Sequence, residues 1–256
     1  MTPPRRIFFA LWPEPGVARQ LDALAGAAHA VCGGRRMRRD TLHLTLAFLG
    51  DVADAQFDSA CEAADEVAEK VGDAGTRSRG PACGDATVEA DAATATSEFG
   101  VGIPLAGATP PLRGAPSAAS GRAGDAPQEV PLGDTPLRID RIAHWKHNHI
   151  VWAGCDAVPA ALATLAAELA AALRRRGFRL DSRPFAAHVT LLRNARCDGE
   201  LPALAPFDWS VRDFVLVRSH LDAAGARYEI VGRWAVPSPT APPRGAASDL
   251  CERGGA

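Results

Sequence analysis

Short apolar runs alternate with amphipathic segments over the first 71 residues of this 256-residue chain. An aromatic-rich run at 6–12 predicts a β-strand, and apolar residues at helical spacing predict a helix over 17–30. A second apolar run predicts a strand over 42–49, and apolar positions on one face predict a helix over 55–71. We therefore expect the first part of the chain to fold as strand, helix, strand and helix.

A similar order of elements recurs in the second half of the chain. The sequence predicts strands at 137–142 and 149–153, a helix at 159–176, a strand at 185–193, and two last strands at 211–218 and 227–234. A duplicated α+β unit, whose two halves face each other, is the simplest architecture that fits this order.

Two stretches lack such a pattern. Residues 72–135 and 236–256 are rich in small and polar residues and in proline, and they contain few large apolar side chains. Such segments cannot bury enough apolar surface to offset their chain entropy, so we expect both to be disordered. The predicted domain spans 1–235, and its folded core lies in 5–71 and 136–235.

Charge narrows the class of protein. The formal net charge of −2 gives no overall attraction to nucleic acid, so any site for a polyanion must be local. Arginines do cluster beside two of the apolar runs, at Arg35, Arg36, Arg38 and Arg39, at Arg174, Arg175, Arg176, Arg179 and Arg183, and at Arg193 and Arg196. These clusters are either solvated surface charge or a surface that faces phosphate.

Cysteine usage and hydropathy exclude other classes. The six cysteines contain no C-x-x-C pair, which argues against a zinc knuckle and against a short-spaced disulfide framework. No secretory signal precedes the first strand, and no apolar run approaches the ~20 residues that span a bilayer. We therefore expect a cytoplasmic protein that does not associate with membranes.

One tetrapeptide pattern occurs twice, as His43-Leu44-Thr45-Leu46 and as His188-Val189-Thr190-Leu191. Side chains alternate between the two faces of a strand, so each histidine shares a face with the threonine two residues later. The aliphatic residues between them then point into a core. Two such strands side by side would present two imidazoles and two hydroxyls on a common surface.

The segments 42–50 and 183–193, which hold the two motifs, resemble the 2H phosphoesterase superfamily. They are most similar to its RNA 2′,3′-cyclic phosphodiesterase branch, the LigT or ThpR family, also called 2′-5′ RNA ligase. The likeness extends over 5–71 and 136–235. It implies a bilobal, duplicated α+β fold, in which two antiparallel sheets with outer helices surround a central cleft.

The resemblance also implies an activity, which needs neither metal nor cofactor. The enzyme would hydrolyse the 2′,3′-cyclic phosphate at an RNA end to a 2′-phosphomonoester and a 3′-hydroxyl. By the pattern of the family, His43 is the proton donor and His188 the proton acceptor. Imidazole suits either role because its ordinary pKa lies near 6.5, and nothing in this sequence breaks the symmetry between them. Run backwards, the reaction would ligate RNA through a 2′-5′ linkage.

Further residues are expected to bind the substrate. Thr45 and Thr190 would donate hydrogen bonds to non-bridging phosphate oxygens. Arg193 matches a position that contacts the phosphate in LigT-like proteins, and it would add a charge-assisted contact. Phe48 and Phe185, beside the motifs, are candidates for stacking on a base, and packing in the core is the alternative for both.

Other interpretations stay open. His144, His147 and His149 lie close together in sequence, but no carboxylate or cysteine at helpful spacing accompanies them as a metal ligand. A related 2H enzyme would act on a small cyclic nucleotide or a nucleotide-sugar phosphate, and a non-catalytic module would only bind RNA ends. The expected partner is RNA with a 2′,3′-cyclic phosphate terminus, and the expected state is a monomer.

Overall fold

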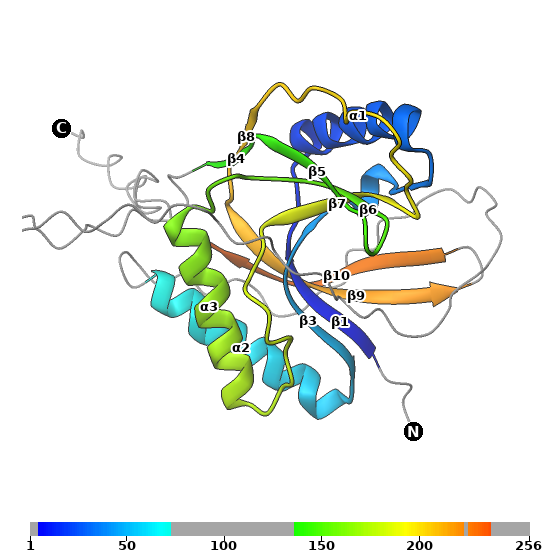
Figure 1. The fold of residues 1–256 in the computed structure, drawn as a ribbon. Coiled ribbons are helices and arrows are strands. Elements are labelled where there is room, and N and C mark those ends of the chain that lie inside the picture. Colours follow the sequence, from blue (N-terminus) through cyan, green and yellow to red (C-terminus); the bar gives the residue numbers. More distant parts are fainter. Residues whose placement is uncertain (1–4, 73–135, 223–224, 237–256) are drawn as a thin grey trace, which may run out of the picture.

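A computed structural model describes residues 5–72, 136–222 and 225–236 (Figure 1). The disorder expected for 72–135 and 236–256 therefore lies outside the described residues, apart from the first position of each stretch. In chain order the elements are β1 (Arg5–Leu11), α1 (Pro15–Cys32), β2 (Arg35–Arg36), the short 3₁₀ helix η1 (Arg39–Thr41), β3 (Leu44–Val52), α2 (Asp54–Gly72), β4 (Leu137–Ile139), β5 (Arg141–Trp145), β6 (Ile150–Gly154), α3 (Ala160–Arg175), β7 (His188–Arg193), β8 (Phe207–Trp209), β9 (Asp213–Asp222) and β10 (Gly225–Ala235).

The strands form one large antiparallel sheet in the order β10-β9-β1-β3-β7-β6-β5, with β2 paired to β7. A separate small sheet contains β4 and β8. The halves β10-β9-β1-β3 and β7-β6-β5 meet where β3 pairs with β7, through the single residue pair Leu44 and Val189. The duplicated unit thus brings its two motif strands side by side, and the predicted α+β class is confirmed.

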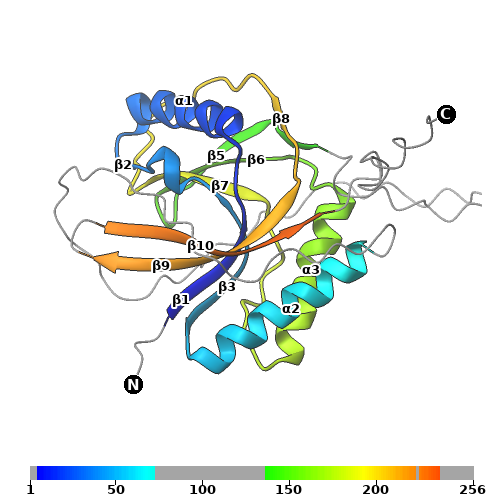
Figure 2. The same ribbon diagram turned by 180° about the vertical axis from the view of Figure 1, so that it is seen from behind.

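Each repeat places its first helix over the other repeat. The helix α1 follows β1 in sequence but contacts β7 and β2, whereas α3 follows β6 and contacts β3. The helices α2 and α3 also pack together. In Figures 1 and 2, α1 lies at the top of the view, and α2 and α3 lie together at the bottom. This exchange of helices ties the two halves together across the weak β3–β7 junction.

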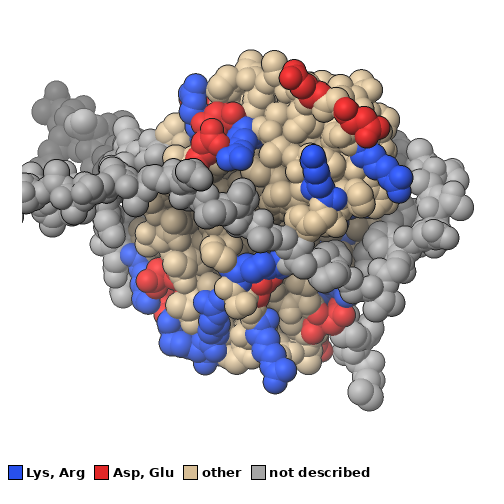
Figure 3. Space-filling model, in the orientation of Figure 1, with Lys and Arg blue, Asp and Glu red and all other residues tan. Residues whose placement is uncertain are grey.

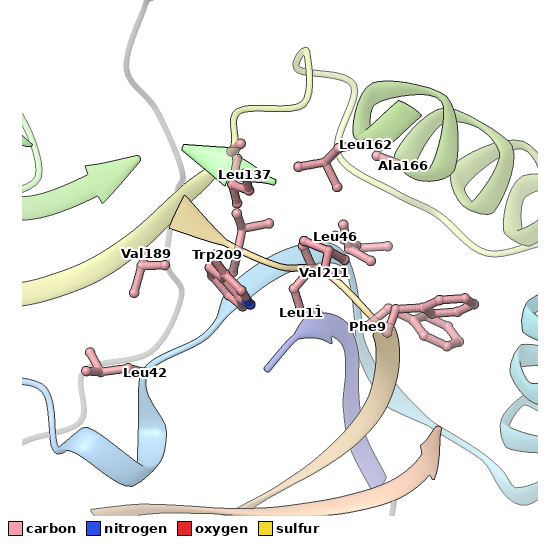
Figure 4. Packing of buried hydrophobic residues seen from close by; sticks show 14 of the residues in the cluster. Phe9, Leu11, Leu42, Leu46, Leu137, Leu162, Ala166, Val189, Trp209 and Val211 are labelled. Atoms are coloured by element: carbon pink, nitrogen blue, oxygen red, sulfur yellow. The ribbon is translucent and has the colours of Figure 1, made fainter. Parts of the chain in front are cut away.

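A single apolar core joins the two halves. It contains the inward faces of both motif strands, with Leu44 and Val189 at 0% exposure, together with side chains from α1 and α3. Trp209 of β8 lies in the middle of this packing in Figure 4. A second cluster on the opposite face of the large sheet includes Phe8 and Val217, so β1 is buried on both faces.

Within the described part of the chain, ion pairs at the surface involve five of the eleven clustered arginines, Arg36, Arg38, Arg175, Arg176 and Arg183. Arg175 and Arg176 of α3 pair with Glu66 of α2, and Arg183 pairs with Asp181. Basic side chains gather over the lower part of the molecule in Figure 3, where α3 lies in Figure 1. These arginines connect helices or loops, and the interpretation as solvated surface charge holds for them.

Some features differ from the sequence predictions. The predicted strand at 137–142 is two strands, β4 and β5, which belong to different sheets and are separated by Asp140. The short elements β2, η1 and β8 are too brief to show a period. Cys32 and Cys197 form a disulfide across 165 residues, which no local spacing could indicate. Among the described residues, no helix is long and apolar enough to cross a membrane.

Candidate active site

The two motifs lie at the centre of the large sheet. Extending the pairing of Leu44 with Val189 by one residue in each direction places His43 opposite Thr190, and Thr45 opposite His188. Because Leu44 and Val189 are fully buried in the core, the histidines and threonines project from the other face of the sheet. All four are half-buried. The predicted meeting of two imidazoles and two hydroxyls is therefore present.

Each histidine is oriented by the same local hydrogen bond. Nδ1 of His43 lies 2.7 Å from the carbonyl oxygen of Thr41, and Nδ1 of His188 lies 2.8 Å from that of Ala186. A carbonyl oxygen can only accept, so Nδ1–H is the donor in both rings. The neutral rings therefore keep their proton on Nδ1, which leaves the lone pair of Nε2 free for chemistry.

Aromatic rings surround His43. The indole of Trp12 stacks parallel to the imidazole, with centroids 5.5 Å apart, and the ring of Phe8 is 4.8 Å away. Tyr228 of β10 meets the same imidazole edge-on at 5.3 Å. These contacts restrict the ring of His43 and shield part of it from water.

Two tryptophans play the corresponding part around His188. Trp145 of β5 and Trp152 of β6 meet its ring edge-on, with centroids 4.7 Å and 6.3 Å away. Trp152 is also the cross-strand partner of Thr190. Each catalytic candidate thus lies among aromatic side chains from its own half of the sheet.

Burial lowers the pKa of both histidines. The pKa of His43 falls from its usual 6.5 to about 4, mainly through desolvation, and the charges of Arg193 and His188 lower it further. The hydrogen bond to Thr41 opposes this shift. The pKa of His188 is also lowered, first by burial and then by the charge of Arg193. At neutral pH both imidazoles of the free enzyme are therefore mostly neutral.

A bulge in each motif strand brings one more side chain onto the site face. The pairing of β3 with β1 skips Leu46, and the pairing of β7 with β6 skips Leu191. The two residues after each threonine are therefore both buried, and the third returns to the face of the histidine. That third residue is Phe48 in β3 and Arg193 in β7.

The bulges make the site pseudo-symmetric. Phe48 and Arg193 occupy equivalent places, but one is an exposed ring (52% exposed) and the other a guanidinium. Burial is the main cause that lowers the pKa of Arg193. The positive charge of Arg193 in turn lowers the pKa of both histidines. Of these two equivalent positions, the one on the His188 side carries a positive charge and the one on the His43 side carries none. This arrangement favours an anion between the two histidines.

Some predicted residues lie elsewhere, and some residues of the site were not predicted. Phe185 is half-buried and packs against the main core, which favours its packing alternative. Trp12, Tyr228 and the tryptophans near His188 were not predicted to be residues of the site. The available signal was the equivalent position of Trp12 and Trp152 in the two repeats.

The histidines at 144, 147 and 149 were the candidate ligands for a metal ion. Among the residues that the structure describes, no group of three or more His, Cys, Asp or Glu side chains could hold a metal ion. His147 and His149 lie in the turn between β5 and β6, outside the two-histidine site. Whether the reaction is independent of metal stays a prediction.

Two H-x-T strands side by side, at the centre of a duplicated α+β fold, define the 2H class of phosphoesterases. The family model described as "LigT like Phosphoesterase" matches residues 11–74 and 154–228, just over half of the chain. The chain belongs to this family.

Individual relatives agree with the family. The chain is 26% identical over 240 residues to the RNA 2′,3′-cyclic phosphodiesterase of Escherichia coli (strain K12), covering 92% of this chain and 99% of that protein. Its fold is similar to that of E. coli LigT complexed with 3′-AMP, with a TM-score of 0.58 and 22% identity over 92% and 99% of the two chains. It is also similar to the protein TT0787 of Thermus thermophilus, with a TM-score of 0.53 and 17% identity over 90% and 97%.

Proposed function

We propose that this protein hydrolyses the 2′,3′-cyclic phosphate at RNA ends to a 2′-phosphomonoester and a 3′-hydroxyl. One observation carries the proposal: His43 and His188 lie on adjacent central strands, both anchored through Nδ1, so that each offers Nε2 on the same face. Binding alone would not require two matched groups of this kind. A hydrolase also agrees with membership of a phosphoesterase family.

The opening of a cyclic phosphodiester needs a base and an acid on opposite sides of phosphorus, because attack and departure are roughly in line. We assign the base to His188, whose Nε2 takes a proton from the attacking water as the new P–O bond forms. His43 protonates O3′ as the P–O3′ bond breaks. The phosphate stays on O2′, and one water molecule is consumed.

The low pKa of His43 fits this assignment only when substrate is bound. In the free enzyme the imidazole is neutral, mainly because burial lowers its pKa and partly because of the positive charge of Arg193. A bound phosphodiester anion opposes that charge and favours protonation of the imidazole. The substrate therefore helps to protonate its own general acid.

Thr45 and Thr190 support the phosphate from the same face. Each hydroxyl lies opposite the histidine of the other strand and would donate to a non-bridging oxygen. Arg193 would add a charge-assisted contact to these oxygens. We assign Phe48 to stacking on the terminal base, since its ring is exposed on the site face.

The relatives support the substrate class. The E. coli relative is named for the RNA 2′,3′-cyclic phosphodiester reaction, and the E. coli LigT structure holds 3′-AMP. We carry the RNA substrate to this chain as a proposal, and 2′-5′ ligation as the reverse of the same reaction. The cytoplasmic location and monomeric state stay predictions.

Product analysis tests this function. A short RNA that ends in a 2′,3′-cyclic phosphate is incubated with the protein, and the product is compared by chromatography with authentic 2′- and 3′-phosphate standards. The proposal expects the 2′-phosphate alone. A 3′-phosphate, or an unchanged cyclic end, would contradict it.

A further inference from the structure

Arg35 of β2 lies directly opposite Arg193 of β7. The two-residue strand β2 pairs antiparallel with the end of β7, with Arg35 opposite Arg193 and Arg36 opposite Leu192. Directly opposite residues in an antiparallel pair project from the same face, about 5 Å apart at Cβ. Arg35 therefore projects from the face that carries the two histidines.

The neighbour of Arg35 supports this orientation. Arg36 points the other way and is held against α1, where its guanidinium donates to the carboxylate of Asp22 at 2.5 Å and to the carbonyl of the same residue at 3.1 Å. Alternation along the strand then turns Arg35 toward the site. The charge of Arg35 acts on both Arg193 and Tyr228, which places it near these site residues.

The backbone that carries Arg35 is fixed. Gly34 has a φ of +82°, and a Cβ there would lie 2.7 Å from the carbonyl oxygen of Arg193, so the two segments pack without a side chain between them. The disulfide between Cys32 and Cys197 also links the segment before Arg35 to the segment that follows Arg193. The position of Arg35 relative to Arg193 is therefore set by the fold.

The pair of guanidiniums lacks a compensating charge. Arg36 and Arg38 each pair with a carboxylate, but within the described part of the chain neither Arg35 nor Arg193 has such a partner. Like charges directly opposite each other destabilise a strand pair. Arg193 is needed for the phosphate between the histidines, so Arg35 is available for a second anion.

We propose that Arg35 binds the internucleotide phosphate on the 5′ side of the nucleotide that carries the cyclic phosphate. Arg35 then makes the enzyme select the end of an RNA chain over a free nucleoside 2′,3′-cyclic phosphate. This inference rests on the proposed function and names the substrate class of that same site. A charge-assisted contact of this kind is expected to favour the longer substrate by about tenfold in kcat/KM.

Three substrates separate the possible outcomes. They are adenosine 2′,3′-cyclic phosphate, the dinucleotide ApA with a 2′,3′-cyclic end, and the same dinucleotide with an uncharged methylphosphonate linkage. The native protein is expected to prefer the charged dinucleotide by about tenfold over the other two. Arg35→Gln is expected to abolish that preference while leaving turnover of the mononucleotide within about twofold.

Arg39→Gln is the matched control, since Arg39 is exposed, lies four residues away, and has no ion pair within the described residues. It is expected to keep the preference. Arg35→Gln should also reduce the slope of log KM against log salt for the dinucleotide by about 0.7.

The inference is overturned if the native protein treats charged and uncharged dinucleotides alike. It is also overturned if Arg35→Gln slows the mononucleotide and the dinucleotide equally, because Arg35 would then share the terminal phosphate with Arg193. Failure of the native protein to hydrolyse any of the three substrates would instead contradict the proposed function.

Discussion

The pH dependence of catalysis follows from the lowered pKa values of the two histidines. With a pKa of about 4, only about one His43 in a thousand is protonated at pH 7 in the free enzyme. The pKa of His188 is lowered as well. The productive state needs one protonated and one neutral histidine, whichever carries which role. Above pH 6.5 its population therefore falls about tenfold for each pH unit.

The assay is kcat/KM for a short RNA with a 2′,3′-cyclic end, measured between pH 4.5 and 8.5 at constant ionic strength. We expect a maximum below pH 6.5 and a slope of log kcat/KM near −1 at higher pH. The profile of kcat should fall at higher pH than that of kcat/KM, because the bound anion favours the protonated imidazole. Arg193→Gln, which removes the charge that lowers both pKa values, should move the alkaline limb of kcat/KM upward in pH.

An optimum of kcat/KM above pH 7, or a plateau between pH 6.5 and 8, would refute this reasoning. Either result would mean that the histidines of the free site are not held neutral by burial and by Arg193. If kcat and kcat/KM fell at the same pH, the bound anion would not favour protonation of the imidazole, and that part of the reasoning would be refuted.

Three further predictions concern the rate of the reaction and the stability of the fold that carries the site. Thr45→Val and Thr190→Val should each lower kcat about tenfold to a hundredfold, because a hydrogen bond to a charged phosphate is lost, and unchanged turnover would remove these hydroxyls from the site. Gly34→Ala should lower the free energy of unfolding by about 1–3 kcal/mol more than Gly33→Ala, because a Cβ at Gly34 meets backbone while one at Gly33 meets nothing within 4 Å; equal losses in urea titrations would contradict the close approach. His43 is neutral when folded and has a pKa near 6.5 when unfolded, so the unfolded state binds more protons between about pH 4 and 6.5. This contribution to stability is complete above pH 6.5 and is lost as the pH falls, by at most about 1.4 kcal/mol per pH unit, and His43→Gln should flatten the loss in urea titrations.

The motif strands were predictable because their signals are local. Apolar runs predicted both strands, and the alternation of side chains along a strand placed each histidine on the same face as its threonine. The repeat of strand, helix and motif strand predicted that two such strands belong to equivalent units. The structure adds that the two strands pair at Leu44 and Val189. This pairing could not be predicted, because a local sequence pattern does not give the register between distant strands.

The remainder of the site depends on long-range packing. The bulges after Thr45 and Thr190 decide that Phe48 and Arg193 face the site, and strict alternation from each histidine would place them on the opposite face. Tyr228 arrives from β10, about 40 residues after the second motif. Such contacts follow from sheet order, which a local pattern cannot give.

The arginine clusters show the same limit. The resemblance to the LigT-like family assigned Arg193 to the phosphate, but for the other clustered arginines the sequence left solvated charge and phosphate contact as alternatives. The structure divides them, because Arg175 and Arg176 pair with Glu66 while Arg35 and Arg193 face each other on the site side. Arg35 is placed on the site side by the two-residue strand β2, which is too short to show a pattern of apolar and polar residues in the sequence.

The most direct test of the two-histidine mechanism is turnover of a 2′,3′-cyclic RNA end by the native protein, by His43→Ala and by His188→Ala, with and without a metal chelator. The account predicts that each substitution lowers turnover by about 10²–10⁴-fold while far-UV circular dichroism stays unchanged, and that the chelator has no effect on the native protein. Native-like turnover by either folded variant, or loss of native turnover on chelation that added metal restores, would contradict it.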